Sequence, residues 1–343
     1  MNPKNPQPLV KRPNERKYRA ILLWTAKAIV GLSILAWILF RVDLVEVFAQ
    51  IKSAQSRQIA AAALCSFAAM IPYAFHHKSA LAFSARPVPA STFLKILFQL
   101  RFYALALPGN AGALVKWHKI TRVTGSSGTA LVIMLATRYT HSVTVIGFAA
   151  FAVYLDPNFP WPAFRPLFAA IAVAVVFITW ILALARVRDR SQSQDRTNAQ
   201  NAGPHRMLWR QMQQAAITLG GWAPAQRIRY AASLIAFASA GLCFEILQDY
   251  FIARAIGIDT GLIVFIWLRG AIMMCHAAPF TVSGLGVREA GMVAILVNYG
   301  IGQEKALAFS FTYFIVAVLF RGAVGSVLEG WDVYIKKTPH HSN

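Results

Sequence analysis

The sequence has few acidic residues and few charged residues of any kind. Aspartate and glutamate number 13 against 34 lysines and arginines, for a net charge of +21, and 57% of the 343 residues are hydrophobic. A soluble fold of this size cannot bury so much apolar side chain, which excludes a disordered chain and a plain soluble enzyme. Several apolar runs are long enough to cross about 30 Å of hydrocarbon. The basic excess therefore predicts anionic membrane lipids as partners, and no nucleic acid.

Cysteine is scarce as well. Cys65, Cys243 and Cys275 all lie in apolar stretches, without CxxC spacing and without the even number of a disulfide framework. No HExxH, DxD or clustered Cys/His spacing occurs in the chain. We therefore expect core cysteines, no metal site and no cofactor.

The first apolar run, residues 20–40, follows a tail with six lysines and arginines. Because the run is longer than the apolar core of a signal peptide, it is interpreted as a retained anchor with a cytoplasmic tail. The other apolar segments cover residues 59–75, 92–107, 129–155, 164–185, 229–253, 262–278, 287–299 and 305–328.

Two pairs of these segments are short and meet at helix-breaking residues, one pair around Pro108 and Gly109 and the other around residues 279–286. Short, paired segments are typical of discontinuous membrane helices. The pattern predicts an all-α, polytopic integral membrane protein with about six full spans and two re-entrant or broken-helix hairpins.

Basic residues concentrate in one set of connecting segments, which the positive-inside rule places in the cytoplasm together with both termini. We expect a bacterial inner membrane. The order of helices and hairpins predicts an inverted repeat, with one half at residues 20–155 and the other at 156–335, between tails at 1–19 and 336–343. Residues 186–229 are expected to form a cytoplasmic linker and a helix in the interface plane.

Two glycine-rich breaks are each followed by a basic residue and a polar helix start: LPGNAGALVK at 107–116 and VSGLGVREAG at 282–291. These motifs and the layout resemble the transmembrane region of lysylphosphatidylglycerol synthase and its stand-alone, flippase-like relatives, over about residues 20–334. Gly284, Gly286, Arg288 and Glu289 match the family's GGLGVRE pattern, with Ser283 in place of a small residue. The first motif departs from the family at Asn110, at Lys116 and at Thr137–Arg138.

The resemblance implies movement of a lipid between leaflets, in the synthase an aminoacylated phosphatidylglycerol and in relatives polyprenyl-linked sugars or other lipids. Because the sequence ends at Asn343, soon after its last apolar run, we expect no synthesis of lysyl-lipid by this chain alone. An alternative is a membrane-embedded enzyme or an accessory subunit of lipid or glycan assembly, with Glu289 or Asp249 as a base. The expected protein partners are a second copy of the chain or a protein of lipid biosynthesis.

Ionisable residues at mid-membrane are costly and usually paired or functional. No catalytic residue is predicted. The predicted headgroup-binding residues are Gly109, Asn110, Gly112, Lys116, Ser283, Gly284, Gly286, Arg288 and Glu289. The predicted buried charge network contains Arg101, Arg138, Glu245, Asp249 and Arg269.

Two alternatives stay open for Arg288, which either clamps a phosphate bidentately or pairs with a buried carboxylate. Glu245 and Asp249 lie four residues apart, on one face of a helix. Their carboxylates are expected to form ion pairs with Arg138 or Arg269, or to exchange protons during transport.

Overall fold

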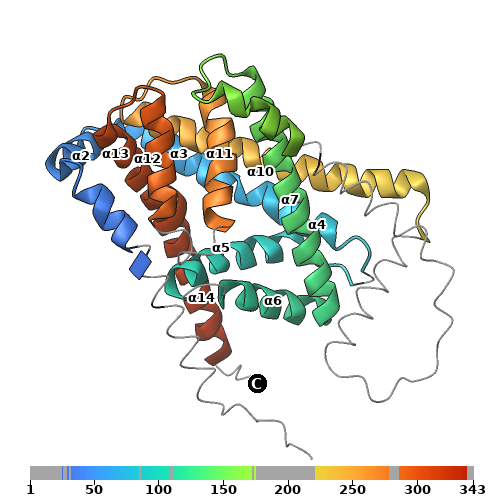
Figure 1. Ribbon diagram of the computed structural model, residues 1–343. Helices are drawn as coiled ribbons and strands as arrows, with labels where there is room; N and C mark the ends of the chain where they lie inside the picture. Colours follow the sequence, from blue (N-terminus) through green and yellow to red (C-terminus); the bar gives the residue numbers. More distant parts are fainter. Residues whose placement is uncertain are drawn as a thin grey trace, which may run out of the picture.

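The computed structural model describes residues 32–84, 86–107, 111–171, 221–277 and 286–337, together with positions 25, 29, 30 and 174. All regular secondary structure in these residues is helical, which confirms the predicted all-α class (Figure 1). The helices in chain order are α2 (Leu44–Lys52), α3 (Ser56–Ala68), α4 (Met70–Ala80), α5 (Ala90–Ala106), α6 (Ala111–Thr124), α7 (Ser127–Leu155), η1 (Pro162–Phe164), α10 (Pro224–Ala255), α11 (Leu262–Ala277), α12 (Val287–Asn298), α13 (Gln303–Tyr313), the π-helix η3 (Phe314–Leu319) and α14 (Phe320–Lys337).

Four helical stretches are long and apolar enough to cross a membrane: Ser56–Ala80, Ser127–Leu155, Ala225–Ala255 and Gln303–Ile335. They coincide with four of the six predicted spans. Of the other two predicted spans, 20–40 is described in its second half, where residues 32–39 are helical, whereas most of 164–185 lies outside the described residues. Most of the linker 186–229 and all of the tail 1–19 also lie outside them. Large hydrophobic side chains such as Leu64, Phe151 and Val327 are exposed on the described helices, as expected for surfaces that face lipid.

Helix α2 lies between two of the apolar runs, where the sequence analysis predicted no helix. The Asp43 side chain caps the helix by accepting a hydrogen bond from the Val45 amide at 2.8 Å. Val47 is fully buried in the main hydrophobic core, and α2 packs against α13. One buried side chain in a short polar segment is too weak a periodic signal to predict a helix.

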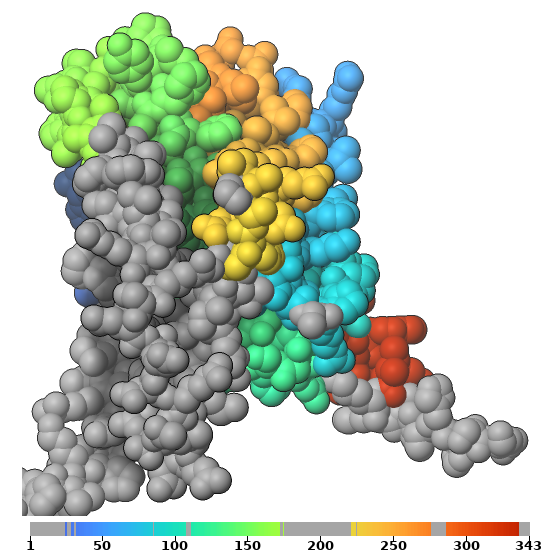
Figure 2. Space-filling model, turned by 90° about the vertical axis from the view of Figure 1, so that its right-hand side faces the viewer, coloured from blue at the N-terminus to red at the C-terminus, as the bar shows by residue number. Residues whose placement is uncertain are grey.

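Helices α3 and α4 form one long stretch that runs antiparallel to α10. The Gln55 amide donates to the Ala255 carbonyl at 2.9 Å, whereas at the other end the rings of Phe75 and Phe237 stack 5.5 Å apart. Figure 2 shows the N-terminal part of α10, in yellow, directly against the chain around α4, in cyan. This pair joins the first half of the chain to the second.

Two further helix pairs also join the halves, α5 with α14 and α7 with α11, and glycine permits their close approach. A Cβ atom on Gly325 of α14 would lie 2.1 Å from the Phe98 carbonyl oxygen of α5. A Cβ atom on Gly270 of α11 would lie 2.6 Å from the Ala149 Cβ of α7. Larger side chains at these two glycines would force the helices apart.

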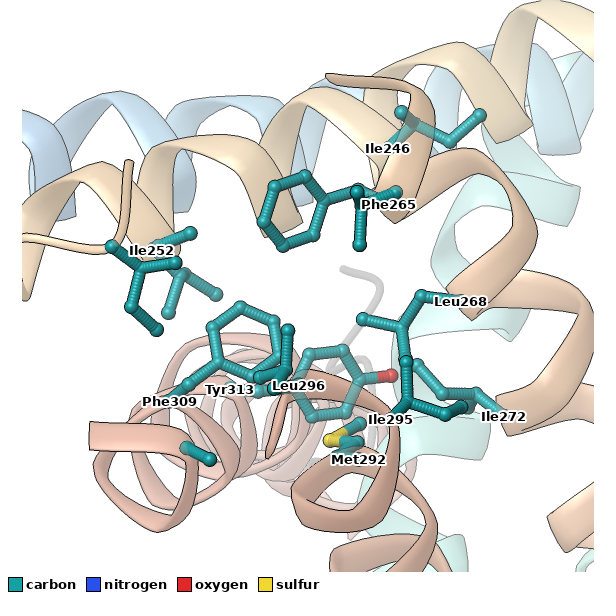
Figure 3. Packing of buried hydrophobic residues seen from close by; sticks show 14 of the residues in the cluster. Ile246, Ile252, Phe265, Leu268, Ile272, Met292, Ile295, Leu296, Phe309 and Tyr313 are labelled. Atoms are coloured by element: carbon teal, nitrogen blue, oxygen red, sulfur yellow. The ribbon is translucent and has the colours of Figure 1, made fainter. Parts of the chain in front are cut away.

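The largest hydrophobic core fills the space between α10, α11, α12 and α13 (Figure 3). Phe265, Leu268, Leu296 and Phe309 are fully buried there. Tyr313 lies at the edge of this core and is followed by the π-helix, in which the backbone widens before α14. The π-helix places the start of α14 beside α3, where polar side chains replace the apolar core.

Candidate functional site

A network of buried polar side chains lies between α3, α10, α11 and α14. We call it the central charge network, and it consists of Ser66, Glu245, Gln248, Asp249, Arg269 and Arg321. The Arg269 guanidinium lies 2.5 Å from the Asp249 carboxylate and donates to the Glu245 carbonyl at 2.8 Å. Asp249 is fully buried. The predicted pairing of these carboxylates with Arg269 is thus present in the structure.

Arg321 completes the network and was missed by the sequence analysis. It donates to the Ser66 hydroxyl at 2.6 Å and to the Gln248 side chain at 2.9 Å, and it lies 3.5 Å from Glu245. The available signal was a single arginine inside the apolar run 305–328. Arg138, the other partner proposed for the two carboxylates, forms no ion pair with them in the described structure.

Arg288 is the first basic residue of α12 and is 5% exposed. Its guanidinium donates to the neighbouring Glu289 carboxylate at 3.0 Å and lies over the rings of Tyr313 and Phe314. Glu289 also accepts a hydrogen bond from the Gly286 amide at 2.7 Å, which caps the helix. The Arg288 charge is therefore compensated by a buried carboxylate, which was the second of the two alternatives for this residue. Contact of Arg288 with a phosphate stays a prediction.

Basic side chains from α4, α5, α6 and α7 converge beside the central charge network. We call them the basic cluster, and they are His76, His77, Arg101, Lys116, Arg138 and His141. Lys116 interacts electrostatically with Arg101 and Arg138, and also with each of the three histidines. A predicted headgroup lysine and two predicted network arginines, which the sequence analysis separated, therefore lie near one another.

The cations of the basic cluster lack carboxylate partners. Among the residues that the structure describes, Arg101, Lys116 and Arg138 form no salt bridge within 4 Å. The buried His77 Nε2 and His141 Nδ1 atoms have no hydrogen-bond partner there either. Arg101 and Lys116 are partly buried, whereas Arg138 is exposed, which corrects its predicted place in a buried network. A charge inside the membrane costs about 2.5–3.5 kcal/mol on insertion scales, so the two partly buried cations without a carboxylate are candidates for a ligand site.

The first hairpin contributes more to this site than Lys116 alone. Helix α6 begins at Ala111, and a Cβ atom on Gly112 would meet no described atom within 4 Å. The N-terminus of a helix favours an anion through its free amides and its dipole. Four predicted headgroup residues, Gly109, Asn110, Ser283 and Gly284, lie outside the described residues.

A third set of polar side chains ties the first hairpin to the last helix near its C-terminal end. We call it the α14 polar cluster, and it consists of Lys95, Gln99, Tyr103, Lys119, Glu329 and Asp332. Lys119 lies 2.6 Å from Glu329, and Lys95 pairs with Asp332. The Lys119–Glu329 pair therefore holds α6 against α14.

A fourth set ties α7 to the second hairpin at the opposite end of the molecule. We call it the α7 polar cluster, and it consists of Asp156, Trp267 and Tyr299. The Tyr299 hydroxyl donates to the buried Asp156 carboxylate and accepts from the Trp267 ring nitrogen at 2.8 Å. Burial and the Asp156 carboxylate raise the pKa of Tyr299 above its ordinary value. The hydroxyl is therefore protonated at neutral pH, as donation requires.

Replacement of Tyr299 by phenylalanine is expected to lower the free energy of unfolding by about 1–3 kcal/mol, because the Asp156 carboxylate loses its donor while staying buried. The measurement is thermal denaturation of the purified protein in detergent. The control is Tyr154→Phe, since Tyr154 lies near the same end of α7 and is 74% exposed. Equal stability of the two variants would contradict the role assigned to Tyr299.

One cavity, of about 560 Å³, lies away from these clusters, between the end of α4 and the start of α10. Its lining includes Ser79, Trp222, Arg229 and Tyr230. No group of three His, Cys, Asp or Glu side chains in the described part of the chain is arranged to hold a metal ion.

Four long apolar helices around buried ion pairs define a polytopic α-helical membrane protein with a polar interior. The sequence matches the family model described as the lysylphosphatidylglycerol synthase transmembrane region over residues 24–325. The chain therefore belongs to that family, as its motifs predicted. No curated protein matches it.

Proposed function

We propose that this protein moves an anionic, phosphate-linked lipid between the leaflets of a bacterial inner membrane. The basic cluster holds the headgroup while the acyl or prenyl chains stay in the bilayer. The observation that carries the proposal is a set of three cations from neighbouring helices, Arg101 of α5, Lys116 of α6 and Arg138 of α7, without carboxylate partners in the described structure. An anionic headgroup would supply the missing charge.

An inverted repeat is part of the proposal. Under it, α3–α4 corresponds to α10, α5 to α11, α6 to α12, and α7 to α13–α14. The packing supports this assignment, because each helix contact has a counterpart when the two halves are exchanged. The contact of α5 with α14 corresponds to that of α11 with α7, and the contact of α6 with α7 corresponds to that of α12 with α13. Each of these two corresponding pairs, α5 with α14 and α7 with α11, contains a close glycine contact, at Gly325 and at Gly270.

The α14 and α7 polar clusters also correspond under this exchange. Each joins the hairpin of one half to the long last helix of the other half, and they lie at opposite ends of the molecule (Figure 1). We assign the α14 cluster to the cytoplasmic side, because the basic segments and both termini are expected there. In alternating access, one cluster separates while the other stays closed.

Translocation of a lipid labelled on its acyl chain, measured in proteoliposomes by reduction of the label in the outer leaflet, tests this function. The probes are acyl-labelled phosphatidic acid and acyl-labelled phosphatidylglycerol. We expect the double variant Arg101→Gln/Lys116→Gln to slow movement at least tenfold, because each lost cation weakens headgroup capture. The matched control is Arg122→Gln, which removes one charge from the exposed last turn of α6 and should move lipid at the wild-type rate.

Absence of protein-dependent movement for both probes would overturn the carrier function. If the probe stays in its leaflet but its headgroup is altered on chromatography, the result favours the alternative of a membrane-embedded enzyme. Lipid movement at the wild-type rate in the double variant would show that the headgroup does not bind at the basic cluster.

A further inference from the structure

We infer that the headgroup bound at the basic cluster carries at least two negative charges, as a terminal phosphomonoester or a diphosphate does. This inference rests on the proposed function for the location of the headgroup. It goes beyond that function because it excludes phosphodiester headgroups and the aminoacylated phosphatidylglycerol after which the family is named. It follows from the charges that remain after the ion pairs of the interior are counted.

The central charge network is neutral. Arg269 and Arg321 provide two positive charges, and Glu245 and Asp249 provide two negative charges. Both carboxylates lie within 4 Å of an arginine, and Asp249 is completely buried. Neither carboxylate is free to compensate a further cation, although Glu245 interacts at longer range with Arg101 and His141.

The other ion pairs next to the site are also balanced one to one. A carboxylate lies within 4 Å of the basic nitrogen in each of them. These pairs are Arg288–Glu289, Lys119–Glu329 and Lys95–Asp332. Each pair therefore leaves no net charge for the basic cluster.

Arg101 and Lys116 remain, with two positive charges on partly buried side chains that no described carboxylate pairs, whereas the neighbouring Arg138 is exposed. A phosphodiester carries one negative charge and would leave one of these two cations uncompensated. A lysyl ester of phosphatidylglycerol adds two ammonium groups and would increase the positive charge. A terminal phosphate carries about −1.5 to −2 at pH 7, and a diphosphate carries more, so these headgroups neutralise both cations.

The available hydrogen-bond donors favour the same headgroups. The unpartnered His141 Nδ1 adds one potential donor to these cations, whereas His77 uses its Nδ1 proton to donate to the Tyr73 carbonyl at 2.8 Å. A terminal phosphate offers three strong acceptor oxygens, whereas a phosphodiester offers two non-bridging oxygens. No described atom lies within 4 Å of a Cβ placed on Gly112, so the start of α6 leaves room for a phosphate group.

Binding of short-chain lipids to the purified full chain, measured by native mass spectrometry and by titration, tests the inference. Farnesyl phosphate and dioctanoyl phosphatidic acid carry the same terminal phosphate on a prenyl and on a diacylglycerol chain. Dioctanoyl phosphatidylglycerol and its lysyl ester are the competing headgroups. We expect at least one phosphomonoester to bind ten times more tightly than phosphatidylglycerol, and the preferred chain to identify the source of the lipid.

Variants separate the role of charge from folding. Lys116→Gln should reduce the preference for the phosphomonoester at least fivefold, while Arg122→Gln on the same helix leaves it unchanged. Gly112→Leu should block binding by filling the open space, without a change in net charge or in thermal stability. If Lys116→Gln fails to fold, Gly112→Leu still decides whether the headgroup lies at the start of α6.

Equal or tighter binding of phosphatidylglycerol or its lysyl ester would overturn the inference. If such a lipid is also translocated, the carrier function stands and only the headgroup class is wrong. If phosphomonoesters bind selectively and no lipid moves, the headgroup class stands and the carrier function is wrong.

Discussion

Replacement of Arg269 by glutamine is expected to lower the free energy of unfolding by about 3–5 kcal/mol. The Asp249 carboxylate is completely buried and lies 2.5 Å from the Arg269 guanidinium. Removal of one partner leaves the other as an uncompensated charge away from water, which costs far more than the pair itself contributes. Denaturation of the purified variant in detergent micelles, followed by intrinsic fluorescence, measures the loss.

The matched control is Arg254→Gln, which breaks the ion pair with Asp259 at the end of α10. The Arg254 and Asp259 side chains are 42% and 88% exposed, so solvent screens their charges and the expected change is below about 1 kcal/mol. Equal losses from the two variants would contradict the assignment of Arg269 to a buried network.

A second substitution in the same protein tests whether the uncompensated Asp249 charge causes the loss of stability. In Arg269→Gln/Asp249→Asn both charges are absent, while Glu245 and Arg321 keep each other. The double variant should therefore regain at least half of the stability lost in the single variant. If it is no more stable than Arg269→Gln, the uncompensated Asp249 charge is not what destabilises the single variant.

Cross-linking of α6 to α14 is expected to stop lipid movement, with full recovery on reduction. Lys119 and Glu329 form an ion pair between the first hairpin and the last helix of the other half. If this cluster separates during each cycle, a short bifunctional thiol reagent that joins Lys119→Cys to Glu329→Cys arrests the protein in one state. Translocation in proteoliposomes should fall more than tenfold and return after reductant is added.

The background for this experiment replaces Cys65, Cys243 and Cys275, the three cysteines of the chain. The control pair is Arg254→Cys/Asp259→Cys, an ion pair within one turn region, where a cross-link restrains no contact between halves. Unchanged movement in the fully cross-linked 119/329 protein would show that the α14 polar cluster does not open during transport.

Much of the fold could be predicted from the sequence. The apolar runs coincide with α5, α7, α10, α11, α12 and the α13–α14 stretch, because residues that face lipid or a dry core have to be apolar over the length of a span. Helix α2 was missed, since its stability comes from a cap at Asp43 and from one side chain, Val47, that packs on a distant helix.

The partners of the buried charges could not be predicted. Arg269 and Asp249 were both candidates because isolated charges in apolar runs are rare and costly. Their pairing, the capture of Glu245 by Arg321, and the isolation of Arg138 depend on how helices distant in sequence face one another. The spacing of charges along one helix gives the face on which they lie, but not the residue opposite.

The sequence by itself determined that this protein is a helical membrane protein of the lysylphosphatidylglycerol synthase transmembrane-region family, because hydropathy, charge bias and glycine motifs are local properties of the chain. Only the tertiary structure decided which charges are neutralised and which are not. Arg288 has Glu289 beside it, whereas Arg101, Lys116 and Arg138 come together from three helices without a described carboxylate. Charge compensation is a property of distances in space, and those distances exist only after the helices have packed.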